Sequence, residues 1–152
     1  MKSKFHIIVA VACLAILTAC GGGSKKSDPV VVPQPAYAIK DVTVGPGADT
    51  TTLAEKGDLV TVAYTGYLYD ATKASTSYKG TKFDTSVGGT PLSYVVASGQ
   101  LITGFDEGVK GMKVGGKRTV LIPASMGYGA KGQGSIPANA NLVLDIELTA
   151  IK

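Results

Sequence analysis

The sequence contains very few of the side chains that carry nucleophilic and metal chemistry. Its 152 residues include no tryptophan, one histidine, His6, and two cysteines, Cys13 and Cys20. All three stand in the first twenty residues. The rest of the chain therefore has no side chain for Cys–His or Ser–His–Asp catalysis, and no imidazole or thiolate to bind zinc. We expect no metal and no other cofactor, and a function that depends on shape, backbone donors, aromatic rings and a few carboxylates.

The main part of the chain also lacks an excess of positive charge. The formal net charge of +4 includes four lysines within the first 26 residues. From Tyr37 onward there are 11 Lys and Arg against 10 Asp and Glu, without a basic stripe. We therefore expect no nucleic-acid partner, because such partners are bound through clustered Lys and Arg.

The start of the chain has the pattern of an export signal. Lys2 and Lys4 precede an uncharged apolar run, Ile7–Leu17. A membrane-spanning helix needs about 20 apolar residues, so this shorter run fits the centre of a signal peptide. The four residues LTAC, ending at Cys20, resemble the bacterial lipobox, in which the cysteine sulfur receives a diacylglyceryl group. We predict that residues 1–19 are a signal peptide that is removed; an ordinary secretory signal, or a buried cysteine, is the alternative.

Residues 20–36 are predicted to be a flexible tether that begins with a lipidated Cys20. The stretch after the cysteine reads GGGSKKSDPVVVPQP, which is rich in Gly, Ser and Pro and has no periodicity. Fully extended, it spans roughly 50 Å. The expected location is the extracytoplasmic side of a bacterial cell envelope, at the periplasmic face of the outer membrane, with the lipid as the membrane contact.

Residues 37–152 form the predicted folded domain, in which apolar residues alternate as they do in β-strands. The alternation is clearest in LVTVAYTGYLY at 59–69 and in NLVLDIELTAI at 141–151. Two polar or glycine-rich stretches, Asp70–Lys82 and Met126–Ala140, are predicted to be long loops. The predicted strands are Tyr37–Val44, Leu59–Tyr69, Leu92–Val96, Arg118–Ile122 and Asn141–Ile151.

One short helix is predicted within Gln100–Gly116. Thr103 and Asp106 have the spacing of an N-terminal capping box, with Asp in place of the usual Glu or Gln. Gly111 or Gly115 can take the left-handed conformation that ends a helix. The apolar positions recur at intervals of four and three residues, which places them on one helical face. These positions are Phe105, Val109 and Met112.

Two glycines inside this helix indicate that another element packs closely against it. Gly104 and Gly108 each cost about 1 kcal/mol relative to alanine in a helix. The strands and this one helix together predict an α+β fold, in which a curved antiparallel sheet half-wraps a short helix.

Taken together, the motifs of the domain resemble those of FKBP-type peptidyl-prolyl cis–trans isomerases. Eight short runs follow the order and spacing of that family over essentially the whole domain. They are VxYTGxL at 62–68, KFDxS at 82–86, LIxGFxEGV at 101–109, MxVGGKR at 112–118, IP at 122–123, YGA at 128–130, IPAN at 136–139 and LVLDIEL at 142–148. The family fold, a half-wrapped sheet around a short helix, agrees with the fold predicted from periodicity.

The resemblance implies that the protein catalyses rotation about X–Pro peptide bonds. The barrier to this rotation, about 18–20 kcal/mol, comes from amide resonance, and no bond is made or broken. A dry apolar pocket disfavours the planar, more polar amide, so the reaction needs neither a nucleophile nor a metal. The implied substrates are proline-containing polypeptides outside the cytoplasm, and the implied inhibitors are macrolides such as rapamycin. The protein is expected to be a monomer.

The resemblance also assigns residues to this pocket. Phe105 would form its floor, and Asp84 would stand at its rim, facing the twisting amide. The Ile102 N–H and the Tyr128 hydroxyl would bind substrate carbonyls. These four are the predicted catalytic residues. The predicted substrate-binding residues are Tyr64, Phe83, Leu92, Leu101, Ile136 and Leu144.

Several positions differ from the common family pattern, and two interpretations stay open. Phe105 stands where many members have Trp, and Leu92 and Leu144 stand where aromatic residues are frequent. No arginine follows the FDxS run, so we expect Asp84 to be less restrained. The protein is either an active isomerase or a peptide-binding or chaperone module without useful turnover. On periodicity alone, Leu101, Ile136 and Leu144 would be ordinary core residues. Asp84 would merely start a turn.

Overall fold

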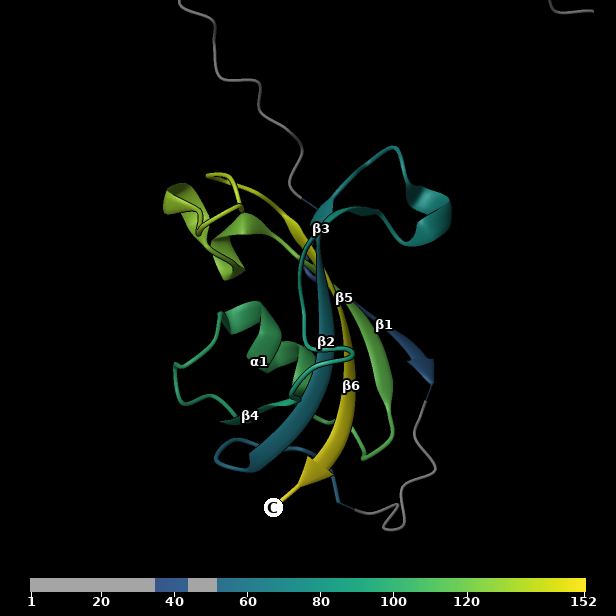
Figure 1. Ribbon diagram of the computed structural model, residues 1–152, viewed down its shortest axis with the longest axis vertical. Coiled ribbons are helices and arrows are strands. Elements are labelled where there is room, and N and C mark those ends of the chain that lie inside the picture. The colour runs from purple at the N-terminus through teal and green to yellow at the C-terminus, as the bar shows by residue number, and fades with distance from the viewer. Residues whose placement is uncertain (1–34, 44–51) are drawn as a thin grey trace, which may run out of the picture. The chain divides into compact units, whose positions relative to one another are not determined.

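Figure 1 shows a curved sheet with a short helix lying against one face. The structure is a computed structural model, and it describes residues 35–43 and 52–152. All of these residues belong to one unit, Val32–Lys152. The predicted signal peptide, the predicted lipidation site at Cys20 and the predicted tether up to residue 34 lie outside the described residues.

Six strands, all paired antiparallel, and one α-helix make up the described domain, which confirms the predicted α+β fold. The sheet order is β1-β5-β6-β2-β3, and β4 pairs with the first half of β2, along the same edge as β3. No helix in this part of the chain is long and apolar enough to cross a membrane. The elements are β1 Ala38–Thr43, β2 Leu59–Tyr69, β3 Lys79–Thr85, β4 Leu92–Val95, α1 Thr103–Val109, β5 Lys117–Ile122 and β6 Leu142–Ile151, with 3₁₀ turns at Ala74–Thr76, Ala124–Met126 and Gly129–Lys131.

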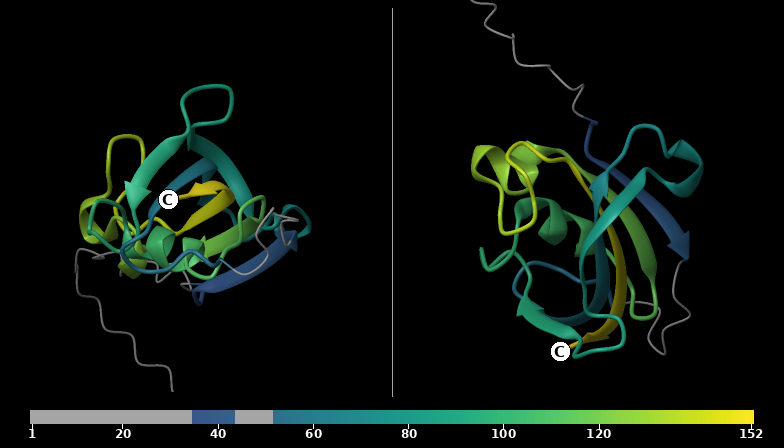
Figure 2. Two further views of the ribbon diagram at one scale, coloured as in Figure 1. Left: turned by 90° about the horizontal axis from the view of Figure 1, so that it is seen from below. Right: turned by 45° about the horizontal axis from the view of Figure 1, so that its top comes forward.

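The two longest strands, β2 and β6, lie side by side at the centre of the sheet and supply most of its buried face. Their apolar residues alternate because successive side chains of a strand point to opposite faces. The sheet twists and curves, so that this apolar face closes around α1 (Figure 2). The fully or almost fully buried residues of the two strands on this face are Val60, Val62, Leu142, Leu144, Ile146 and Leu148.

The two glycines of α1 lie where the helix presses on β5. An ideal Cβ at Gly104 would lie 2.4 Å from Cγ2 of Ile122, and one at Gly108 would lie 2.9 Å from Cγ2 of Val120. Both distances are shorter than real side-chain contacts, so no side chain fits between the helix and the strand. The predicted close packing is confirmed, and it explains why poor helix formers stand here.

The capping box predicted from Thr103 and Asp106 is wrong. Ile102 is the N-cap of α1, and no side chain makes a capping hydrogen bond. The Asp106 carboxylate is buried instead and accepts a hydrogen bond from the Ala97 N–H at 3.1 Å, which ties the loop after β4 to the helix. At the other end, α1 stops at Val109 and the chain is already extended at Lys110. Gly111 has the expected positive φ of 70°, but its N–H donates to the Ala54 carbonyl and not to a carbonyl of the helix.

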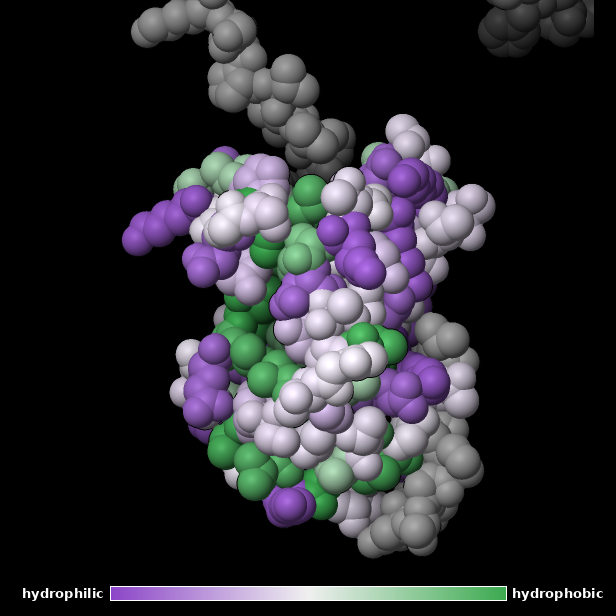
Figure 3. Space-filling model, viewed as in Figure 1, coloured by the Kyte–Doolittle hydropathy of each residue, from purple (hydrophilic) through white to green (hydrophobic). Residues whose placement is uncertain are grey.

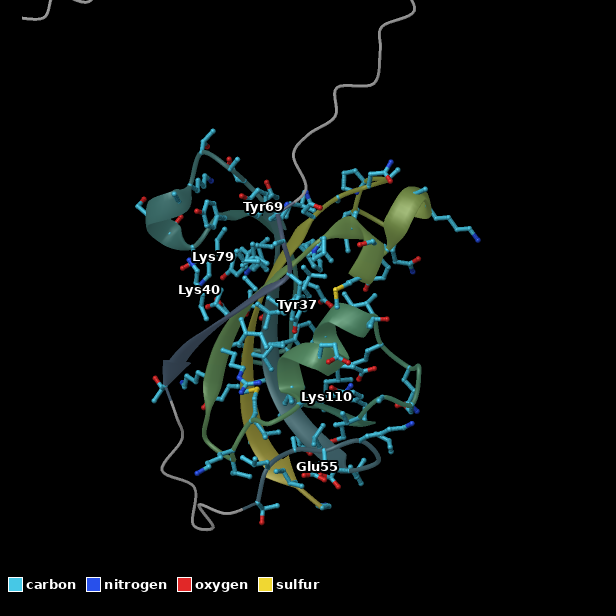
Figure 4. The ribbon with its side chains drawn as sticks, turned by 180° about the vertical axis from the view of Figure 1, so that it is seen from behind. Tyr37, Lys40, Glu55, Tyr69, Lys79 and Lys110 are labelled. Carbon is cyan, nitrogen blue, oxygen red and sulfur yellow. The ribbon has the colours of Figure 1, made fainter. Side chains whose placement is uncertain are left out.

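The predicted loop Asp70–Lys82 is shorter than expected, because its second part is a strand. The edge strand β3 begins at Lys79 and is mostly exposed, so its sequence, KGTKFDT, carries little apolar alternation. The rest of the loop is closed by the Asp70 N–H, which donates to the Tyr78 carbonyl at 2.9 Å, and by the stacked rings of Tyr69 and Tyr78. Figure 4 shows Tyr69 and Lys79 near this end of the sheet.

Candidate functional site

A cavity of about 240 Å³ opens between the helix and the edge of the sheet. Residues of β2, β3, β4, α1 and β6 line it, together with residues from the loops before α1 and after β5. Figure 3 shows apolar side chains gathered in a hollow on one side of the molecule. The lining residues are Tyr64, Phe83, Asp84, Leu92, Gln100, Leu101, Ile102, Phe105, Tyr128 and Leu144.

Phe105, in the first turn of α1, closes the bottom of the cavity. Only 4% of its surface is exposed. Its ring makes edge-to-face contacts with Tyr64 and Tyr94, each with ring centres 5.7 Å apart. Such contacts fix the orientation of the ring and add to the stability gained by its burial. The cavity therefore has a rigid aromatic floor.

Asp84 is held by two hydrogen bonds. The Tyr64 hydroxyl donates to Oδ2 of Asp84 at 2.5 Å, and the Thr85 N–H donates to Oδ1 at 2.8 Å. Both carboxylate oxygens of Asp84 thus have a donor although no arginine follows the FDxS run, and the expectation that Asp84 is less restrained than in relatives with that arginine stays a prediction. Burial of the phenol, followed by its hydrogen bond to Asp84, raises the pKa of Tyr64 to about 12, so this donor stays protonated at neutral pH.

Phe83 and Asp84 both line the cavity, although neighbouring residues of a strand normally point to opposite faces. A β-bulge in β3 explains this arrangement. Gly66 pairs with Asp84 and Tyr67 pairs with Lys82, so Phe83 is an extra residue without a partner in β2. The bulge therefore allows two successive side chains to reach one cavity.

Two hydrogen-bond donors at the cavity are available to a bound molecule. The Ile102 N–H donates to no atom of the described part of the chain, whereas the Ile102 carbonyl accepts from the Phe105 and Asp106 N–H groups. Tyr128, which precedes a 3₁₀ turn, is 37% exposed. Its hydroxyl likewise makes no hydrogen bond to residues 35–43 or 52–152. Both donors thus lack a partner within the described residues.

A larger cavity, of about 340 Å³, lies over the central strands and contains charged side chains. Lys79 pairs with Asp145 at 2.7 Å, and Lys117 pairs with Glu147 at 2.9 Å. Both carboxylates of this cavity are thus already neutralised. Across the described residues, no three His, Cys, Asp or Glu side chains are grouped to hold a metal ion. We place the functional site at the smaller, apolar cavity.

The motifs around this cavity match one protein family. A sequence profile of FKBP-type peptidyl-prolyl cis–trans isomerases matches residues 50–149. The chain belongs to this family. The matched range contains every residue that lines the apolar cavity.

Curated relatives of the FKBP family match a shorter part of the chain. The FK506-binding protein of Neisseria meningitidis serogroup A is 50% identical over 62 residues, which cover 40% of this chain and 57% of that protein. FK506-binding protein 3 of Candida albicans is 50% identical over 62 residues, which cover 41% of this chain and 15% of that protein. The chain thus spans little more than half of one relative and a small part of the other.

Solved structures of FKBP proteins share the fold. AtFKBP13 is 32% identical, with a TM-score of 0.62 over 78% of this chain and 96% of that chain. FkpA from Escherichia coli is 34% identical, with a TM-score of 0.61 over 76% of this chain and 48% of that chain. These similarities agree with the curved sheet and single helix seen here.

The FKBP-type cavity brings together nine of the ten catalytic and substrate-binding residues predicted from the sequence. The exception is Ile136, which is 7% exposed and packs in the core. It lies in a tight turn, in which its N–H and carbonyl both hydrogen-bond to the Gln133 backbone, and it is not among the residues that line the cavity. Gln100 lines the cavity and was not predicted; its position directly before the LIxGF run is the signal that could have found it.

The Tyr64→Phe variant is expected to lose less stability at high pH than the wild type. The pKa of Tyr64 is about 12 in the folded protein, against an ordinary value of 10.0. The stability that the protonated Tyr64 hydroxyl contributes to the folded state is therefore complete below about pH 10. It is lost as the pH rises toward 12, because Tyr64 of the unfolded chain releases its proton at a lower pH than Tyr64 of the folded protein. Urea unfolding at several pH values measures this slope. If the free energy of unfolding of the variant falls as steeply with pH as that of the wild type, the raised pKa of Tyr64 is contradicted.

Proposed function

We propose that the protein is a lipid-anchored peptidyl-prolyl cis–trans isomerase that acts on exported or unfolded polypeptides. The observation that carries this proposal is the apolar cavity with Phe105 as its floor and only a few polar groups at its walls. Such a cavity suits a proline ring, which is compact and apolar. Macrolides such as rapamycin are proposed to enter the same cavity.

In the proposed mechanism, the cavity lowers the barrier to rotation without forming a covalent bond. Amide resonance sets this barrier at about 18–20 kcal/mol. Removing water disfavours the planar, polar amide more than the twisted one. The Ile102 N–H and the Tyr128 hydroxyl bind carbonyls of the substrate and hold the chain in place while it twists. Asp84, fixed by Tyr64, presents its carboxylate to the twisting amide.

We further propose that the protein works as a monomer, tethered through Cys20 to the periplasmic face of the outer membrane. Support comes from the LTAC run and the Gly/Ser/Pro-rich stretch that follows it. Uncatalysed isomerisation of X–Pro bonds takes tens to hundreds of seconds, so chains that have just crossed a membrane need a catalyst there. Proline-containing polypeptides of the envelope are the proposed substrates.

The Tyr128→Phe variant tests the proposed substrate contact. Its affinity for a proline-containing peptide is expected to fall by about 0.5–1.5 kcal/mol, because one hydrogen bond to the peptide is lost. Its thermal midpoint is expected to stay near that of the wild type, since the hydroxyl has no partner in the described part of the chain. Isothermal titration calorimetry measures the affinity, and thermal unfolding measures the stability.

A matched control is Tyr69→Phe, which removes a hydroxyl from a tyrosine that stacks on Tyr78, outside the cavity. It is expected to leave the affinity for the peptide unchanged. If Tyr128→Phe lowers the thermal midpoint but leaves the affinity unaltered, its hydroxyl serves the fold and the proposed contact is refuted.

A further inference from the structure

Gly66 lies directly beneath one wall of the cavity. In the sheet it sits between Asp84 of β3 and Leu144 of β6, two residues that line the cavity. An ideal Cβ at Gly66 would lie 2.5 Å from Cζ and 2.6 Å from Cε2 of Phe83, and 3.1 Å from Cδ2 of Leu144. The outer edge of the Phe83 ring thus occupies the space in which any other residue would place its side chain.

Backbone conformation does not explain the glycine at this position. Among the described residues, the glycines with positive φ do not include Gly66. It lies inside β2, where glycine weakens a strand and is expected only if a bulge or a close approach requires it. The second condition holds here, because the ring of Phe83, the extra residue of the bulge in the neighbouring strand β3, lies where a side chain at Gly66 would begin.

The backbone around Phe83 cannot easily move to make room for a side chain at Gly66. Immediately after the bulge, Asp84 is bound by the Tyr64 hydroxyl. Ser86 then binds the Tyr64 backbone twice: its hydroxyl accepts from the Tyr64 N–H at 2.9 Å, and its N–H donates to the Tyr64 carbonyl at 3.0 Å. On the other side, β2 is paired along its length with β6. An added methyl group would therefore displace the ring of Phe83 rather than the strands.

We propose that Gly66 is a positioning residue for the site: the absence of a side chain there sets the place of the Phe83 ring and so the width of the cavity. Glycine at this position acts through Phe83 and touches no substrate itself. The effect on catalysis rests on the proposed isomerase function, whereas the effect on ring position does not.

The test combines Gly66→Ala with Phe83→Leu in the 152-residue chain. Leucine lacks the two ring atoms that would lie within 3.0 Å of an added methyl group, and the third near atom, Cδ2 of Leu144 at 3.1 Å, is the movable end of a side chain. Alone, Gly66→Ala is expected to weaken binding of a proline-containing peptide, and to lower kcat/KM if the wild type is active, by about tenfold. In the Phe83→Leu background, Gly66→Ala is expected to change either quantity less than about twofold. The control Gly89→Ala adds a methyl group whose nearest neighbour is 3.7 Å away, and it should match the wild type.

Ring signals of ¹³C-labelled phenylalanine, read by NMR, report the position of Phe83 independently of activity. Phe83 is identified by the signal that Phe83→Leu removes, among only three phenylalanines in the chain. Gly66→Ala is expected to shift this signal more than that of Phe105. If the wild type binds peptides without turnover, the proposed isomerase function fails, but the affinities and the ring signal still decide the role of Gly66.

Two results would overturn the role of Gly66. The first is wild-type affinity and an unshifted Phe83 signal in Gly66→Ala. The second is an equal loss in the presence and absence of Phe83→Leu, which would point to a general effect on β2. If Gly66→Ala alone does not fold, recovery of folding in the double variant supports the proposal, and failure of the double variant overturns it.

Discussion

The Phe105→Ala variant is expected to lose binding of proline-containing peptides and to lower the free energy of unfolding by about 3–5 kcal/mol. Both effects follow from the position of the ring. Only 4% of Phe105 is exposed, and it contacts the rings of Tyr64 and Tyr94 edge to face. Its removal leaves a void beneath the cavity and takes away the floor on which a proline ring would rest. Urea titration measures the stability, and calorimetry at a temperature where the variant is folded measures the binding.

Loss of stability alone could imitate a loss of function, so Phe105→Ala needs a matched control. Val109 lies on the same helix, is fully buried and does not line the cavity. The Val109→Ala variant is expected to be less stable than the wild type and yet to bind the peptide normally. If Phe105→Ala is destabilised as expected but binds with wild-type affinity, the cavity is not the proline site.

The Cys20→Ser variant is expected to lose all incorporation of a radioactive fatty acid and to leave the membrane fraction. Lipidation requires the thiol, and the LTAC run places that thiol at residue 20. Metabolic labelling of the wild type and the variant measures the effect. The matched control is Cys13→Ser, which changes the other cysteine and is expected to keep the label, since Cys20 remains. Equal labelling of wild type and Cys20→Ser would contradict the proposed anchor.

The sequence was most informative where burial imposes a regular pattern. The strands β2 and β6 alternate clearly because one face of each packs on the core, and both were predicted within a residue of their bounds. The edge strand β3 was missed because it is mostly exposed. A strand that packs no face on the core does not need alternating apolar residues, and its sequence KGTKFDT does not show them. The capping box failed for a different reason: Asp106 is buried and bound to the Ala97 N–H, and tertiary contacts override local spacing.

Most of the cavity was predicted from the FKBP motifs rather than from periodicity. Motifs identify which residues gather, but they do not show how the chain holds them. The restraint of Asp84 by the Tyr64 hydroxyl joins residues on two different strands, and no local pattern reveals it. The space that Gly66 leaves for Phe83 depends equally on the register of β2 and β3. Such features arise only when the strands pair in the folded chain.

The rate of prolyl isomerisation tests the central claim most directly. The cis–trans exchange of a short proline-containing peptide is followed by NMR with and without the 152-residue chain, with Phe105→Ala as the inactive reference. An isomerase accelerates the exchange well beyond the uncatalysed rate, which corresponds to tens to hundreds of seconds, and rapamycin abolishes the acceleration. If the peptide binds in the cavity but its exchange rate stays at the uncatalysed value, the protein is a binding module and not the enzyme proposed here.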